Sequence, residues 1–163
     1  MKVLSKTCKA LQPCTRQRVV WVAALRRVCL DNTLFLPSFP ISDMSVFEIE
    51  KAAMGPRRWI ELCEKQHLND PAATLCPRAT RIIDDSPFAA EVDYVSTEIF
   101  IVPGGRYLVI SAPESISVLD LGCTSNSNCK LIASVEPPEG EYETCIVQAT
   151  PDGMGLVICS SNT

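Results

Sequence analysis

Few side chains in this sequence could support acid–base or nucleophilic chemistry, and they are not grouped. The only histidine of the 163 residues is His67, which lies in a polar stretch close to a proline. A Ser–His or Cys–His pair needs its imidazole beside a nucleophile, and this context is typical of a solvated loop. The chain contains no GxSxG, Walker or GxGxxG motif, and Gly104-Gly105 is too short to cradle a phosphate. We therefore expect no catalytic residue and no enzyme activity.

Carboxylates that lie close together in the sequence do not form a recognisable site either. Asp84-Asp85 lies in a proline-rich stretch, and three glutamates alternate with other residues at positions 139, 141 and 143. We interpret the first as solubilising charge in a linker and the second as a loop between strands. The sequence predicts no bound cofactor.

The nine cysteines lack the spacing of a metal site. Zinc needs three or four thiolate or imidazole ligands close together. No CxxC pair occurs, and the two pairs with a five-residue gap, Cys8/Cys14 and Cys123/Cys129, have no second pair at suitable spacing. An odd number of scattered cysteines, with no secretory signal, indicates reduced thiols and a cytoplasmic or nuclear protein. We expect no metal site.

Charge and hydropathy exclude two further classes of partner. Residues 1–81 carry 13 Lys+Arg and 7 Asp+Glu, whereas residues 82–163 carry 2 and 12. The basic residues alternate with acids on helical segments, so we expect solvated faces and no nucleic-acid partner. The longest strongly apolar run, Val19–Leu25, has seven residues. A membrane span needs about 20 residues, so no membrane partner is expected.

An internal echo reveals how the second half of the chain is organised. Pro103–Ser111 reads PGGRYLVIS and Pro151–Cys159, 48 residues later, reads PDGMGLVIC, with five of nine positions identical. Proline fixes φ at the first corner of a turn, and glycine supplies a positive φ later. A turn followed by an apolar strand, repeated every 40 to 50 residues, is typical of a β-propeller blade. We expect Leu108 and Val109 to be buried in the same way as the two residues 48 positions later.

Six short segments rich in valine and isoleucine carry a strand pattern in this half. Four of them, within residues 97–135, form one expected blade, and residues 144–163 form the first half of the next. Leu119-Asp120-Leu121 stands where blades of the WD-like kind often carry a Trp-Asp dipeptide. A two-layer β structure is the alternative. The expected strands are 97–102, 106–111, 115–121, 130–135, 144–150 and 155–160.

The first half of the chain has helical spacing instead. Thr15 can cap a helix that ends near residues 31 and 32, with Trp21 in its core. Ser45 and Glu48 form a capping-box pattern for a second helix, which ends near Met54. A third helix is expected from residue 56 to residue 66.

These patterns predict an α+β fold, in which an N-terminal helical segment precedes an antiparallel β region of about one and a half propeller-type blades. The expected boundaries follow the change from helical spacing to strand spacing across a proline-rich stretch. Residues 1–32 and 33–66 are helical, residues 67–94 are a linker, and residues 95–163 are the β region.

The N-terminal segment TCKALQPCTRQRVVWVAALRRVC resembles the C-terminal half of an F-box. The likeness rests on a Cys-Lys-x-Leu turn, a short break, and a helix with Val20-Trp21 and Leu25. With NTLFLPSFPISDMSVFEIEKAAMGPRRWIELCEK and the PGGRYLVIS strand, residues 5–163 resemble a fungal F-box protein whose F-box precedes a propeller-like region. The resemblance implies candidate partner-binding residues Leu4, Cys8, Leu11, Val20, Trp21 and Leu25.

In that family the F-box binds the adaptor of a cullin-type ubiquitin ligase, and the C-terminal domain recruits a protein substrate. The resemblance therefore implies a non-catalytic substrate-recruiting subunit. The alternative is a generic propeller-type scaffold without a link to ubiquitin. Repeat architectures need about three units, and no Leu-Pro motif or first F-box helix precedes the matching segment. The sequence thus predicts a piece of a longer protein.

Overall fold

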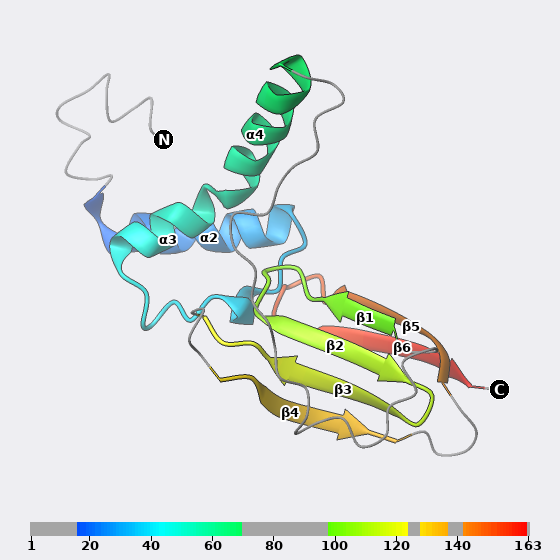
Figure 1. Ribbon diagram of the computed structural model, residues 1–163. Coiled ribbons are helices and arrows are strands. Elements are labelled where there is room, and N and C mark those ends of the chain that lie inside the picture. Colours follow the sequence, from blue (N-terminus) through cyan, green and yellow to red (C-terminus); the bar gives the residue numbers. More distant parts are fainter. Residues whose placement is uncertain (1–15, 70–97, 124–127, 137–141, 163) are drawn as a thin grey trace. The chain divides into compact units, whose positions relative to one another are not determined.

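The computed structural model describes residues 16–69, 98–123, 128–136 and 142–162 (Figure 1). The chain divides into two compact units. A helical unit comprises residues 1–32 and 40–79, and a β unit comprises residues 33–39 and 80–163. Helices followed by antiparallel sheets confirm the α+β class.

The helical unit contains α2 (Arg18–Asp31), α3 (Val46–Ala53) and α4 (Gly55–Asn69). The N-cap of α2 is Gln17, which makes no side-chain capping bond, so the prediction of Thr15 as the cap is wrong. The helix ends where the sequence predicts, at residues 31 and 32.

The core of this unit forms between α2 and α3. Trp21, Leu25 and Cys29 recur every four residues on α2, which places them on one side of the helix, and all three are buried. Ile49 and Ala53 supply the buried side of α3. The predicted core position of Trp21 is confirmed, since only 4% of the residue is exposed.

The start of α3 is fixed by the predicted capping box. The backbone N–H of Ser45 donates to Glu48 Oε2 at 2.7 Å, and the N–H of Glu48 donates to Ser45 Oγ at 3.3 Å. The Ser45 hydroxyl and N–H lower the pKa of Glu48. The Arg18 guanidinium donates to the carbonyls of Ile41 and Met44, so it ties the loop before α3 to the start of α2.

Helix α4 begins directly after Met54 and continues to Asn69. The predicted end at residue 66 is therefore three residues early, and His67 lies in a helix and not in a linker loop. The rest of the predicted linker lies outside the described residues. In the part of the chain that the structure describes, no helix has the length and apolarity to span a bilayer.

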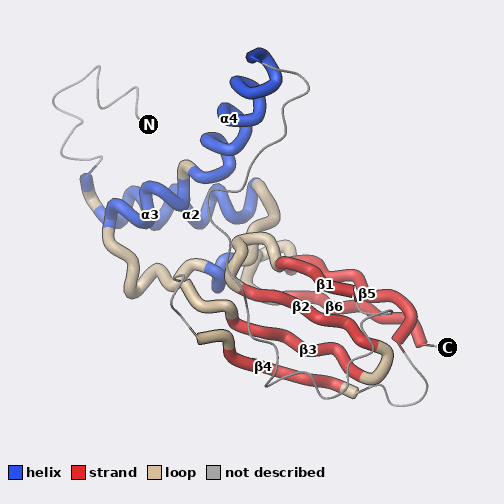
Figure 2. The backbone as a smooth tube through the Cα atoms, viewed as in Figure 1, coloured by secondary structure: helices blue, strands red, loops and turns tan. Residues whose placement is uncertain are grey.

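The β unit contains six strands in two antiparallel sheets (Figure 2). The first sheet has the order β1-β2-β3-β4, and β5 pairs with β6 in the second. All six predicted strands are present, with ends that differ by no more than two residues. Their bounds are β1 (Glu98–Ile101), β2 (Tyr107–Ala112), β3 (Ser115–Asp120), β4 (Lys130–Val135), β5 (Tyr142–Ala149) and β6 (Leu156–Asn162).

A short segment from the first half of the sequence belongs to the β unit. We call residues 33–39, which include the 3-10 turn η2 (Leu36–Ser38), the strap. The sequence places them at the start of a helical extension of residues 33–66, and the structure divides that range between the two units. Tertiary contacts with the hairpin turns, described below, override the local helical context.

Candidate interaction site: two equivalent hairpins and their strap

The 48-residue echo in the sequence is also an echo in strand register. Hairpin 1 (β1–β2) pairs Ile101 with Leu108, and hairpin 2 (β5–β6) pairs Ala149 with Leu156. Each residue of the second pair lies 48 positions after its counterpart. The three preceding rungs of hairpin 1 keep the same offset, because the partners of residues 98, 99 and 100 correspond to those of residues 146, 147 and 148.

The turns repeat hydrogen bond by hydrogen bond as well. The N–H of Val102 donates to Tyr107 O at 2.9 Å, and 48 residues later the N–H of Thr150 donates to Gly155 O at 2.9 Å. The N–H of Gly105 likewise donates to Val102 O, as residue 153 does to residue 150. The two hairpins are therefore two copies of one structural unit.

Each hairpin has two faces, because side chains alternate along a strand and cross-strand partners share a side. We call them face A and face B and define both from the pairing register. Face A comprises Ile99, Ile101, Leu108 and Ile110 in hairpin 1 and Val147, Ala149, Leu156 and Ile158 in hairpin 2. Face B comprises Glu98, Phe100, Val109 and Ser111 in hairpin 1 and Ile146, Gln148, Val157 and Cys159 in hairpin 2.

Opposite faces meet inside the β unit. The buried cluster of Val102, Val109 and Ile116 packs against Phe100 of the same sheet and against three residues of the other hairpin. Those three are Val147, Leu156 and Ile158. Face B of hairpin 1 therefore covers face A of hairpin 2.

This packing overturns one expectation from the sequence. Val109 is completely buried, whereas its counterpart Val157 is 47% exposed. The prediction that equivalent side chains are buried alike is therefore wrong, although the strands themselves are equivalent. The physical reason is that each hairpin uses a different face for the contact that joins them.

The strap binds the turns of both hairpins. The N–H of Phe35 donates to Pro103 O and the N–H of Leu36 donates to Gly153 O, each at 2.9 Å. Phe35 also meets the ring of Tyr107 edge to face, with centroids 5.5 Å apart. Consecutive backbone amides thus join the two copies of the repeated turn.

Gly104 allows the strap to come close to the first turn. Its φ is +119°, and a Cβ at this position would lie 2.5 Å from the Cβ of Ser38, which is itself buried. The equivalent position in the second turn is Asp152, whose carboxylate accepts from the Thr150 hydroxyl and from Met154 N–H. The two turns therefore share a backbone but differ in what secures them.

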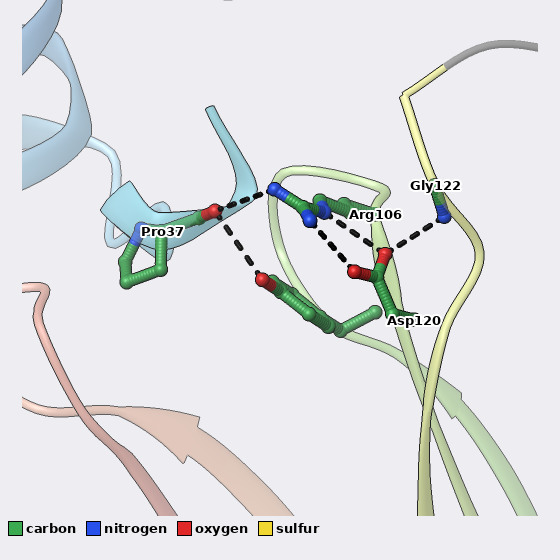
Figure 3. Close-up of polar contacts among 5 residues, drawn as sticks. Pro37, Arg106, Asp120 and Gly122 are labelled. Carbon is green, nitrogen blue, oxygen red and sulfur yellow. Dashed lines mark hydrogen bonds and ion pairs between the residues drawn. The ribbon is translucent and has the colours of Figure 1, made fainter. Parts of the chain in front are cut away.

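An ion pair fastens the first turn to the end of β3 (Figure 3). Arg106 Nε donates to Asp120 Oδ1 at 2.9 Å and Arg106 Nη2 donates to Asp120 Oδ2 at 2.6 Å. Asp120 Oδ1 also accepts the N–H of Gly122 at 2.7 Å. On the strap side, Arg106 Nη1 and the Tyr107 hydroxyl both donate to Pro37 O, at 3.4 and 3.5 Å.

The electrostatics of this cluster stabilise its charges. The two Arg106 hydrogen bonds, followed by that of Gly122, outweigh burial and lower the pKa of Asp120. Asp120 reciprocally raises the pKa of Arg106, and burial raises the pKa of Tyr107. The Arg106 guanidinium lies 5.1 Å from the centroid of the Tyr107 ring, which adds a cation–π contact. With the carboxylate ionised and engaged by three donors, the arrangement is suited to joining β2, β3 and the strap.

The residues that the F-box resemblance singles out are divided by the structure. Leu4, Cys8 and Leu11 lie outside the described residues. Trp21 and Leu25 are buried in the core between α2 and α3, and Val20 is half-buried. Of the predicted set, only Val20 is both described and accessible to a partner.

Metal and thiol chemistry finds no arrangement in the described ranges. No group of three or more His, Cys, Asp or Glu that could hold a metal ion occurs among those residues. Cys29, Cys63, Cys123 and Cys159 are free thiols. Burial raises the pKa of Cys29 to about 11, so this thiol stays protonated at neutral pH.

A second accessible feature lies within the helical unit. A groove of about 430 Å³ runs beside the start of α4, where Ile60 is 54% exposed. Trp59 and Leu68 of α4 are also more than half exposed. The groove is lined by Val28, Asn32, Ala53, Pro56, Arg57, Ile60, Glu61 and Glu64.

Sequence reasoning identified both turns but missed the strap and the ion pair. Arg106 and Asp120 are 14 residues apart, and only the β2–β3 register brings them together. The aspartate stands at the position compared with a Trp-Asp dipeptide, which was the one available signal. Comparisons of this chain with protein-family models, with curated proteins and with solved structures found no match.

Proposed function

We propose that this chain is a non-catalytic protein–protein interaction module whose β unit is built from propeller-type repeats. The observation that carries the proposal is the contact of face B of hairpin 1 with face A of hairpin 2. The exact 48-residue offset in register supports it, because successive blades of a propeller share one backbone arrangement.

The choice of faces distinguishes two ways of stacking a repeated sheet. Repeats related by a two-fold axis meet through the same face, as in any isologous contact. Repeats related by rotation around a ring meet through opposite faces, since every unit presents the same face in the same direction. The A-to-B contact follows the second pattern. It favours a propeller-type arrangement over the two-layer sandwich that the sequence left open.

The specific form of this function that the sequence indicates is a substrate-recruiting F-box-type subunit of a ubiquitin ligase in the cytoplasm or nucleus. In this form α2 contributes to binding the cullin-ligase adaptor, and the β unit recruits a protein substrate that the sequence does not identify. Val20 is the residue through which the α2 contact can be tested, because it remains accessible.

A titration of the isotope-labelled chain with purified adaptor, followed by NMR, tests this form. We expect shift changes on α2 that Val20→Asp weakens at least tenfold in apparent affinity. The matched control is Val19→Asp on the same turn of α2, at a neighbouring side chain that is 67% exposed and outside the predicted set. An absence of shift changes, or equal binding by both variants, would contradict the ubiquitin-ligase form.

A generic propeller-type scaffold is the second candidate, and one observation favours it. Trp21 and Leu25, the largest described residues of the F-box-like pattern, fill the core of their own unit. Side chains spent on that core cannot also anchor a partner. The same titration distinguishes the candidates, because the scaffold form predicts no contact with the adaptor.

A further inference from the structure

Two sheet faces of the β unit point outward although their composition is that of a contact. Face A of hairpin 1 consists of Ile99, Ile101, Leu108 and Ile110, and the first two are 63% and 67% exposed. Face B of hairpin 2 includes Ile146 and Val157, which are 67% and 47% exposed. A solvated face of an antiparallel sheet normally carries polar residues. Neither outward face has a charged side chain at its four defining positions.

We propose that these two faces bind each other between two copies of the chain, so that the protein associates head to tail through its β unit. This inference rests on the proposed propeller-type packing. It extends the contact that already exists within one chain to a contact between two chains.

The argument comes from the repeat itself. Face A of hairpin 2 receives a B face inside the chain, and face A of hairpin 1 has the same backbone register. Leu108 and Ile110 on the outward face are identical to their counterparts Leu156 and Ile158 in the buried contact. The outward A face is therefore built to receive a B face.

The outward B face of hairpin 2 completes the pair. Val157 matches Val109, which is fully buried in the contact within the chain. Where hairpin 1 has Glu98, hairpin 2 has Ile146, so the outward B face has lost the charge of its counterpart. A second copy thus supplies a B face that is uncharged at its four positions and matches the register of A.

The expected association is heterologous, because A and B are different surfaces on each copy. Such contacts do not saturate in a two-fold dimer, and they continue until a ring closes or a filament grows. An isologous A-to-A dimer, which would also cover isoleucines, makes a different prediction and can be separated from it.

Sedimentation velocity over a concentration series, up to about 1 mM to include weak association, tests the proposal. Ile101→Glu disables the outward A face, and Val157→Glu disables the outward B face. Both side chains are exposed, so neither change removes a buried core residue. The matched control is Phe47→Glu on α3, where a 72% exposed apolar residue of the helical unit receives the same charge.

We expect the wild type and Phe47→Glu to associate as concentration rises, and each face variant alone to stay monomeric. An equimolar mixture of the two face variants should form a one-to-one dimer that grows no further. That dimer is expected because one partner keeps its B face and the other keeps its A face. Circular dichroism of each variant confirms that the fold is retained.

Three results would overturn the inference. They are a wild type that remains monomeric throughout the series, a mixture of variants that remains monomeric, and self-association of Val157→Glu alone, which indicates A-to-A contact. The adaptor titration reads α2, so its failure does not affect this test. The contact within the chain is read separately by methyl NOEs, so a monomer that shows those NOEs overturns this inference alone.

Discussion

Hairpins 1 and 2 have the same backbone and register but differ in almost everything that surrounds them. Hairpin 1 is extended by β3 and β4, and its turn is held by Gly104 against Ser38 and by the Arg106–Asp120 ion pair. The turn of hairpin 2 is secured locally, through Asp152. The comparison teaches that the repeated letters specify the turn and the strand pairing, whereas the non-repeated letters determine how each copy is used.

The largest expected difference between the hairpins is at the third residue of the echoed segment. Gly104→Ala should lower the free energy of unfolding by about 3 kcal/mol, because a positive φ becomes strained and the new Cβ collides with Ser38. Asp152→Ala at the equivalent position should cost much less, since it removes only hydrogen bonds of an exposed side chain. Urea denaturation of both variants measures the difference.

A second variant separates the two causes at Gly104. Gly104→Ala combined with Ser38→Gly removes the collision but keeps the unfavourable φ, so part of the lost stability should return. If the double variant is no more stable than Gly104→Ala, the close approach of the strap does not contribute, and the account of the first turn is wrong.

The next difference concerns the faces. Val109→Ala should destabilise the β unit by about 2 kcal/mol because it leaves a cavity in a fully buried cluster. The matched change Val157→Ala on the outward face should stay within about 0.5 kcal/mol at protein concentrations where the chain is monomeric. Thermal or urea unfolding of the pair provides the comparison, and equal costs would show that the same face is buried in both hairpins.

How much of this the sequence could predict differs between the two kinds of letters. Turn residues and apolar alternation act locally, so all six strands and the capping box at Ser45 were predictable. The length of α4 was underestimated because no proline or glycine marks its end in the sequence before Pro71.

The site was less predictable because it depends on contacts between residues that are distant in the sequence. The strap lies about 70 residues before Arg106 and Tyr107, which bond to it, and nothing in its own composition assigns it to a sheet. The use of opposite faces was also hidden, since identical letters at Val109 and Val157 gave no sign that one would be buried and the other exposed.

A smaller effect is expected from exchanging the residues before the echoed strands. Arg106→Met, which copies residue 154 into the first turn, should cost about 1.5 kcal/mol because the Asp120 carboxylate loses its charged donor. Met154→Arg in the second turn should change stability by less than about 0.5 kcal/mol, since Met154 is an exposed residue. Similar losses in both exchanges would remove this distinction between the turns.

The smallest expected effect is on pH dependence. Because the folded pKa of Asp120 lies below its ordinary value, the unfolded chain binds more protons in that range, and stability rises with pH there. The contribution is complete above the ordinary aspartate pKa of about 3.9 and is lost as pH falls through the lower folded value. Asp120→Asn should therefore flatten the decline of unfolding free energy below about pH 5. An unchanged slope would mean that the ion pair does not hold the carboxylate ionised.

The central claim is that face B of hairpin 1 covers face A of hairpin 2, and methyl-to-methyl NOEs measure that contact most directly. In a sample with labelled valine, leucine and isoleucine methyls, we predict NOEs from Val109 and its cluster to Leu156 and Ile158. Chain diluted well below its association range restricts these NOEs to contacts within one molecule. NOEs from the cluster to Val157 in place of Leu156 and Ile158 would show that like faces meet, and would contradict the account.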